Sequence, residues 1–179
     1  MTTARGRITI RLLVVLAVPF GAAGCVSGAG PLPRAAPEPV FDPAAFFAGE
    51  THGVGTLRVV LRGATATDVR GIGRVDAAGT ITLDQEVVQG GGAPKHRRWQ
   101  LRPTGPLRYA GTLTDAVGPV VAITRGNMLE IRFTMRHGLK VEQRLFLQPG
   151  GRVALNRMTI RKLGIVVAQL DERIEKQQR

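Results

Sequence analysis

Turn-forming sequences recur along this chain from residue 51 onward, about 8 to 12 residues apart. All of them contain Gly: Arg62-Gly63, Ala78-Gly79, Gly90-Gly91-Gly92, Thr104-Gly105-Pro106, Val117-Gly118-Pro119, Gly126-Asn127, His137-Gly138 and Pro149-Gly150-Gly151. Between them, apolar and polar residues alternate, which indicates strands with one buried face. Regularly spaced short strands of this kind are typical of an all-β sandwich or barrel.

The alternation is clearest in residues 128–135, where one face carries only apolar residues: Leu129, Ile131, Phe133 and Met135. We count about nine candidate strands, and short turns between consecutive strands make antiparallel hairpins. A meander of this length can close on itself, which removes exposed edges. We therefore expect an antiparallel up-and-down β-barrel of roughly eight to ten strands, spanning residues 41–179.

The two ends of this domain carry different secondary-structure signals. Asp42 followed by Pro43 is a typical start of a helix, and it predicts a short helical turn over residues 42–47. Near the other end, the β-branched sequence "GIVVAQL" predicts a strand to about Asp171, followed by a frayed, charged tail. The apolar residues of the same segment also have helical spacing, so a helix is the alternative: Leu163, Val167, Leu170 and Ile174.

The first 24 residues have the three parts of a secretory signal peptide. Arg5 and Arg7 precede an apolar run, and small residues close it at positions 21–24. Arg11 and Pro19 interrupt the run, so a retained membrane helix is the weaker interpretation.

The single cysteine, Cys25, directly follows these small residues. The sequence "AAGC" resembles the lipobox of bacterial lipoproteins, although Ala22 stands where leucine is usual. This resemblance implies that Cys25 is acylated and becomes the first residue of the mature chain. The alternative is an ordinary signal peptide with an incidental cysteine. With no second cysteine, an internal disulfide is excluded.

Residues 25–40 are rich in Pro, Gly and Ala and contain little to bury, so they read as a flexible tether. Several acyl chains on Cys25 would give stable anchoring, which one chain does not provide. We therefore expect a lipid-anchored protein of the bacterial cell envelope that faces the periplasm. Val26, rather than an aspartate, follows the cysteine and favours the outer membrane.

A series of short motifs follows in order along residues 41–170: Phe46-Phe47-Ala48-Gly49, Gly53-Val54-Gly55, Arg97-Arg98-Trp99, Tyr109-Ala110-Gly111, Gly126-Asn127, Leu155-Asn156-Arg157 and Lys162-Leu163-Gly164. In this order they resemble the domain of unknown function 3833 family, uncharacterised lipoprotein-type proteins of Gram-negative bacteria. The resemblance implies a shape similar to the lipocalins. This chain departs from the family pattern at two places. Family members tend to have an acidic and aromatic strand where "DQEVVQGGGAPK" stands, and a Trp-bearing strand where Leu145-Phe146-Leu147 stands.

Catalytic and metal-binding patterns are missing from the sequence. The three histidines have no metal-ligand spacing, and the only serine, Ser27, lies in the tether. The glycine pairs at positions 53–55 and 71–73 are too sparse for a nucleotide loop and fit a barrel bend better. We therefore expect no enzymatic activity, metal or cofactor.

A small set of residues is left as candidates for ligand contact. Trp99 and Tyr109 lie on neighbouring candidate strands, and Arg97 shares a strand face with Trp99. These aromatics either fill the barrel or line the mouth of a cavity. Arg157 either closes the barrel floor or meets an anionic headgroup.

Two functions remain open. The first is a binding module that holds a small apolar or lipid-like molecule in its barrel, where Gly and Ala leave room for a cavity. The alternative is a non-enzymatic structural or interaction protein of the envelope. Its net charge of +12 would attract anionic partners, and the Arg97-Arg98 cluster would contribute. Nucleic acid is not expected, because basic residues and aromatics are not interleaved.

Overall fold

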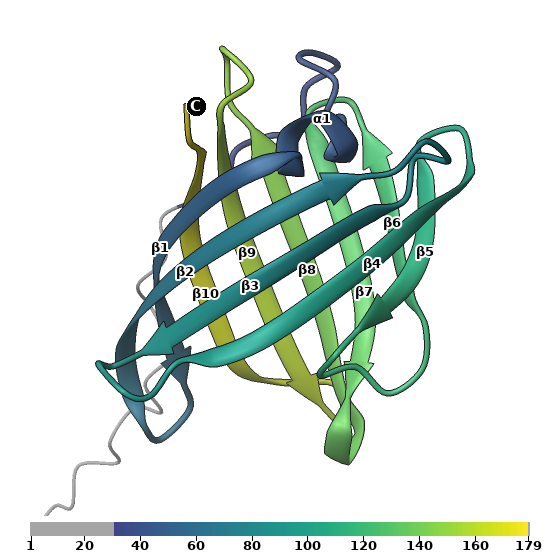
Figure 1. Cartoon of the computed structure of the whole chain (residues 1–179). Coiled ribbons are helices and arrows are strands. Elements are labelled where there is room, and N and C mark those ends of the chain that lie inside the picture. Colours follow the sequence, from purple (N-terminus) through teal and green to yellow (C-terminus); the bar gives the residue numbers. More distant parts are fainter. Residues whose placement is uncertain (1–30, 179) are drawn as a thin grey trace, which may run out of the picture.

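Residues 31–178 are described by the structure, a computed structural model. Within them, ten antiparallel strands form one closed barrel (Figure 1). The strands are β1 (Gly49–Val59), β2 (Gly63–Val75), β3 (Ile81–Gln89), β4 (Lys95–Gly105), β5 (Arg108–Leu113), β6 (Val120–Arg125), β7 (Met128–Met135), β8 (Leu139–Leu147), β9 (Val153–Lys162) and β10 (Ile165–Lys176). Each strand pairs with the next, and β1 pairs with β10. The predicted all-β up-and-down barrel is confirmed.

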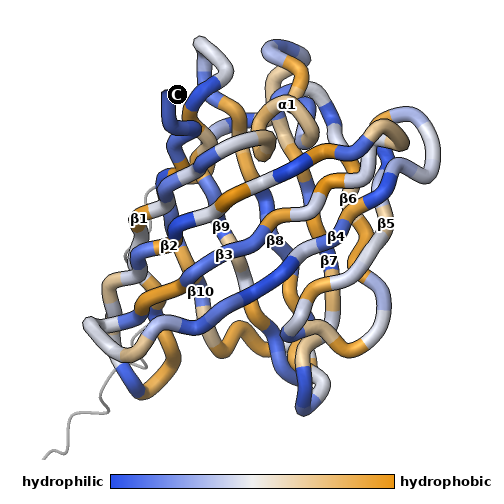
Figure 2. The backbone as a smooth tube through the Cα atoms, viewed as in Figure 1, coloured by the Kyte–Doolittle hydropathy of each residue, from blue (hydrophilic) through white to orange (hydrophobic). Residues whose placement is uncertain are grey.

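The barrel core follows from the alternation seen in the sequence. Figure 2 shows hydrophobic and hydrophilic residues alternating along the strands. In β7, Leu129, Ile131 and Phe133 are buried in the interior, while Arg132 faces solvent. Glu130 also faces outward, but it is buried against the Arg132 side chain, which it meets at 2.8 Å. The core lies inside one closed sheet, and its hydrophobic residues come from α1 with Phe41 and from β3 to β10.

The last strand is longer than predicted. β10 runs to Lys176, which pairs with Thr51 of β1, and Ile174 is buried in the core. The expectation of a frayed tail after Asp171 was wrong, and so was the helical alternative. Pairing with β1 on one side and β9 on the other holds the charged end of β10 in the sheet.

A short helix, α1 (Pro43–Phe47), covers one end of the barrel, as the sequence predicts (Figure 1). The Asp42 carboxylate caps it by accepting hydrogen bonds from the backbone N–H groups of Ala44 (2.9 Å) and Ala45 (3.3 Å). Phe41, Phe46 and Phe47 pack together and are buried against the core. α1 therefore works as a lid of aromatic side chains.

The other end of α1 is held by β10 and β2. Lys176 Nζ donates to the backbone oxygens of Ala45 (2.5 Å) and Ala48 (2.6 Å). Gly73 of β2 lies so close that a Cβ there would sit 1.8 Å from the Phe47 carbonyl oxygen. The absence of a side chain at Gly73 is what allows α1 to pack directly on the sheet.

The chain reaches the barrel before residue 41. Asn127, in the β6–β7 turn, accepts a hydrogen bond from the Ala36 N–H at 2.7 Å, and Phe41 N–H bonds to the Gly126 oxygen. The tether boundary at residue 40 stays a prediction, as do the signal peptide and Cys25, which lie outside the described residues. Over residues 31–178, no helix has the length and apolar character needed to cross a membrane.

Candidate functional site: an interior cavity

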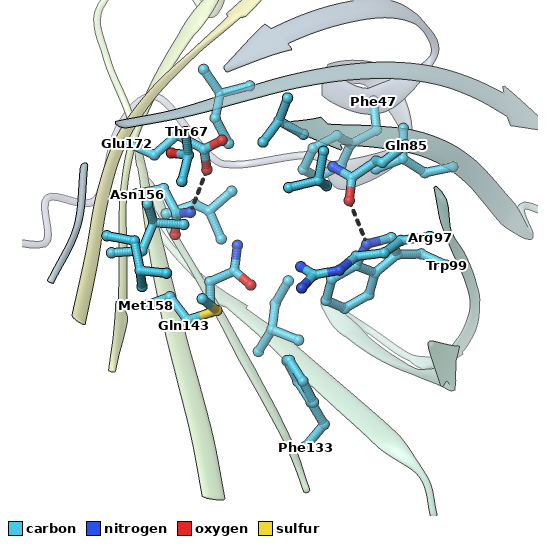
Figure 3. Close-up of a pocket in the computed structure, with 18 of the residues that line it drawn as sticks. Phe47, Thr67, Gln85, Arg97, Trp99, Phe133, Gln143, Asn156, Met158 and Glu172 are labelled. Atoms are coloured by element: carbon cyan, nitrogen blue, oxygen red, sulfur yellow. Dashed lines mark hydrogen bonds between the residues drawn. The ribbon is translucent and has the colours of Figure 1, made fainter. Parts of the chain in front are cut away.

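A cavity of about 80 Å³ lies inside the barrel, beneath α1 (Figure 3). Phe47 bounds it near α1, and Leu57 and Gln89 bound it toward the far end. Inward-facing side chains of β1 to β4 and of β7 to β10 form its wall. Its volume is well above the roughly 10–15 Å³ that one water molecule requires.

One wall of the cavity is apolar and aromatic. Trp99 of β4 packs edge-on against Phe133 of β7, with ring centroids 5.6 Å apart. Its indole Nε1 donates a hydrogen bond to Gln85 Oε1 at 2.8 Å. Since the ring is fixed from both sides, Trp99 offers a preformed apolar face with its polar N–H already satisfied.

The opposite wall is polar, and its hydrogen bonding is incomplete. Asn156 of β9 donates from Nδ2 to Glu172 Oε2 of β10 at 2.8 Å. Two further buried atoms on this wall, Thr67 Oγ1 and Asn156 Oδ1, have no hydrogen-bond partner among the described residues. Buried polar atoms normally have one, so this wall has spare capacity for a polar group.

Glu172 is held close to β1 by a missing side chain. A Cβ on Gly53 would lie 2.3 Å from Glu172 Oε1, so any other residue at position 53 would push the carboxyl group away. The sequence analysis explained Gly53 by a barrel bend, and the structure gives a more specific reason for a glycine at this position. Gly53 makes room for a buried carboxyl group on the neighbouring strand.

Arg97 and Glu172 are the charged residues of the wall. Burial raises the pKa of Glu172, and the Asn156 hydrogen bond and the positive charge of Arg97 offset this only in part. Arg97 forms an ion pair with Asp115 (Nε to Oδ2, 2.6 Å). Figure 3 shows its guanidinium group pointing into the same space as the Gln143 amide. The cavity thus combines an apolar face with both donors and acceptors.

Two of the four predicted ligand-contact residues line this cavity, namely Trp99 and Arg97. They share a strand face, as the period of a strand requires. Arg98, between them, faces outward and pairs with Asp84 (2.5 Å). The expected Arg97-Arg98 surface cluster is therefore split between the two faces of β4, and the cluster interpretation was wrong.

Tyr109 does not line the cavity. It lies on β5, beyond the Trp99 pairing position, and packs on the core as a partly buried residue. Partial burial raises its pKa, and the negative charge of Asp42 adds to the shift. Tyr109 therefore lies beside α1 rather than at a cavity mouth, which explains both its partial burial and the influence of Asp42 on its pKa.

Arg157 also lies elsewhere, on the outer face of β9. Its neighbour Asn156 points inward, so Arg157 must point outward, where it pairs with Asp171 (Nε to Oδ1, 2.6 Å). The expectation that Arg157 closes the barrel floor was wrong. Lys176 and α1 close the end of the barrel instead.

The sequence reasoning missed six polar residues of the cavity, which are Thr67, Gln85, Gln89, Gln143, Asn156 and Glu172. The available signal was a polar residue at an inward position of an otherwise apolar strand face. Gln143, between Val141 and Leu145 on β8, is the clearest case. No group of three metal-ligating side chains occurs within residues 31–178.

A closed antiparallel up-and-down barrel with an interior cavity is typical of lipocalin-like folds. The matching family is described as protein of unknown function (DUF3833), which covers residues 21–176, and the chain belongs to it. No curated protein matches the chain.

A solved structure shares the fold. It is the S-type phycobiliprotein lyase CPES from Guillardia theta, with a TM-score of 0.59 and 6% sequence identity. The similarity covers 74% of this chain and 89% of that one. At this identity the likeness shows the fold alone.

Proposed function

We propose that this protein binds a small amphipathic molecule inside its barrel and works as a lipid-anchored, non-enzymatic protein of the bacterial envelope. The ligand would place an apolar body against Trp99 and Phe133. Its polar group would lie near Glu172, Asn156 and Arg97. Fatty acids and related lipids have this combination. Since the cavity holds about 80 Å³, against roughly 300–1,000 Å³ for ordinary ligand pockets, the barrel would have to widen to take a long acyl chain.

One observation carries the proposal, namely the unequal walls of the cavity. An apolar wall alone would bind hydrocarbon with little selection. The unpartnered atoms Thr67 Oγ1 and Asn156 Oδ1 add a requirement for a hydrogen-bonding group on the ligand. Such sites combine an apolar lining with a few polar groups that fix the ligand's orientation.

The anchoring part of the proposal rests on the sequence around Cys25. The signal-like start, the "AAGC" lipobox and the single thiol all support acylation of Cys25. The protein would then face the periplasm, and Val26 favours the outer membrane. Mass spectrometry of protein purified from its own envelope tests this part, because acylation adds the mass of the lipid at Cys25.

Ligand binding is tested by the fluorescence of Trp99, the only tryptophan of the chain. A series of fatty acids of increasing length is titrated into the full chain in detergent micelles. We expect a saturable change in Trp99 emission that depends on chain length. Met158→Phe, which fills space at the wall, should weaken it. Val121→Phe, on the outer surface, is the matched control.

Native mass spectrometry provides the second measurement. Protein purified from its own envelope should carry a copurifying lipid-like molecule that Met158→Phe loses and Val121→Phe keeps. An unchanged Trp99 signal for every fatty acid, together with no copurifying molecule, would refute ligand binding.

A further inference from the structure

The barrel end opposite α1 exposes large apolar side chains at two adjacent turns. β1 pairs with β10, so the β1–β2 and β9–β10 turns lie together, joined by the hydrogen bond from Val60 N–H to the Val167 oxygen (3.0 Å). Leu61 is 100% exposed and Leu163 is 93% exposed. Ile165 is 70% exposed. We name Leu61, Leu163 and Ile165 the apolar tips; both turns lie at the lower end of Figure 1.

The backbone gives no reason for leucine at these turns. Leu61 has φ of +66° and Leu163 has φ of +50°, the left-handed region that favours Gly and Asn and disfavours a bulky side chain. A leucine there is neither buried nor suited to the turn. Leu107, at the α1 end, has the same backbone geometry (φ of +56°) but is 47% exposed, so nearly complete exposure is what sets Leu61 and Leu163 apart.

The turns and strand ends at this end of the barrel are also strongly basic. They carry six basic side chains: Arg62, Lys95, Arg136, Lys140, Arg161 and Lys162. In the same turns of the described chain, the acidic residue is Asp115, and it is paired with Arg97. Apolar tips in a basic surround match the chemistry of an anionic lipid bilayer.

The path of the N-terminal segment favours the same orientation. Ala36 and Phe41 lie at the α1 end, where their N–H groups bond to Asn127 Oδ1 and to the Gly126 oxygen. Pro31, Leu32 and Pro33 lie midway along the barrel, on the outer face of β1, β9 and β10. Followed back from Phe41 to Pro31, the chain therefore runs from the α1 end toward the apolar tips. The six residue steps from Pro31 to Cys25 span at most about 20 Å, and five residues at strand spacing, as from Thr56 to Leu61, cover about 17 Å. A lipid on Cys25 can therefore reach the bilayer plane at the apolar tips.

We propose that this end of the barrel docks on an anionic bilayer, with the apolar tips at the acyl boundary and the six basic side chains at the headgroups. A second copy of the chain is a poor occupant, because it would bring two sets of basic residues face to face. The proposal does not depend on what the cavity holds.

The test places a tryptophan at a tip and measures its depth in the bilayer. The full chain carrying Leu163→Trp is reconstituted into vesicles of phosphatidylglycerol and phosphatidylcholine with brominated acyl chains, which quench nearby tryptophan. Leu107→Trp is the matched control, because Leu107 is an exposed turn leucine with φ of +56° at the α1 end. The quenching of the unsubstituted chain, which comes from Trp99, is subtracted from both.

We expect several-fold stronger quenching for Leu163→Trp than for Leu107→Trp, and a loss of that difference when Arg62 and Lys162 are changed to glutamate. Ile165→Trp, in regular strand geometry, repeats the measurement should Leu163→Trp fold poorly. Equal quenching at the two ends would overturn the proposal. The proposal would also be overturned if Leu163→Trp were not quenched and this end of the barrel crosslinked to a second copy of the chain or to an envelope protein. Because the Cys25 lipid would tether both variants alike, failure here is separate from failure of the anchoring or ligand proposals.

Discussion

Glu172→Gln tests whether the barrel holds a buried carboxylate at a cost. Burial raises the pKa of Glu172, and Asn156 and Arg97 compensate only in part. A buried polar group with incomplete hydrogen bonding costs about 1–3 kcal/mol, more when charged. Glutamine keeps the shape and an oxygen for the Asn156 N–H (2.8 Å), but it carries no charge. We therefore expect E172Q to raise the free energy of unfolding at pH 7 by about 1–2 kcal/mol.

The stability that E172Q gains over the wild type should increase with pH. The pKa of Glu172 is higher in the folded state than in the unfolded chain, so the folded state holds this proton more tightly. Below the unfolded pKa of about 4.3, the carboxyl group is protonated in both states, so folding of the wild type does not bury a charge at residue 172. As the pH rises above that value, the wild type loses stability until the raised pKa is passed. E172Q has no such loss, so its advantage should grow between pH 4 and pH 7.

Urea unfolding at a series of pH values, followed by Trp99 fluorescence, measures the difference directly. Glu175→Gln is the matched control on the same strand, because Glu175 faces outward and is half-exposed beside Arg173. We expect it to change the unfolding free energy by less than about 0.5 kcal/mol. An E172Q variant less stable than wild type at pH 7, or equally different at all pH values, would refute the reasoning. Glu172 would then be a net stabilising partner of Arg97.

Three further changes test the packing of α1. Gly73→Ala should cost about 1–3 kcal/mol, because its Cβ would meet the Phe47 carbonyl oxygen, while Gly105→Ala, which has open space, should be near neutral in thermal unfolding. Asp42→Ala removes the helix cap and should cost about 1 kcal/mol in urea unfolding. Lys176→Met keeps the aliphatic stem but removes the bonds to the α1 carbonyls. It should cost about 1–2 kcal/mol and increase proteolysis near α1.

Much of the fold was predictable because it depends on local signals. The alternation in β7 and the turns between strands set the barrel class, and Asp42 with Pro43 set the start of α1. The end of β10 was not predictable in this way. Its charged residues look solvent-exposed in sequence, but pairing with β1 and β9 holds them in the sheet up to Lys176.

The cavity was predictable only in part. The two-residue period placed Arg97 beside Trp99 correctly, but the same period puts Arg98 on the other face and Arg157 outside the barrel. Glu172 gave a local signal, as a polar residue between Leu170 and Ile174 on the inward face of β10, but nothing local shows what it faces. Its place opposite Arg97 follows from barrel closure, which no single strand specifies.

The two ends of the barrel obey different requirements. At the α1 end, buried phenylalanines, the Asp42 cap and Gly73 all serve packing, and each is the residue that folding alone would choose. At the far end, Leu61 and Leu163 combine a left-handed backbone with 100% and 93% exposure, whereas Leu107, with the same backbone at the α1 end, is 47% exposed. Residues that oppose the local rules of folding are expected where a protein meets something else. The far end, rather than the lid, is therefore where the contacts of this barrel with its surroundings should be sought.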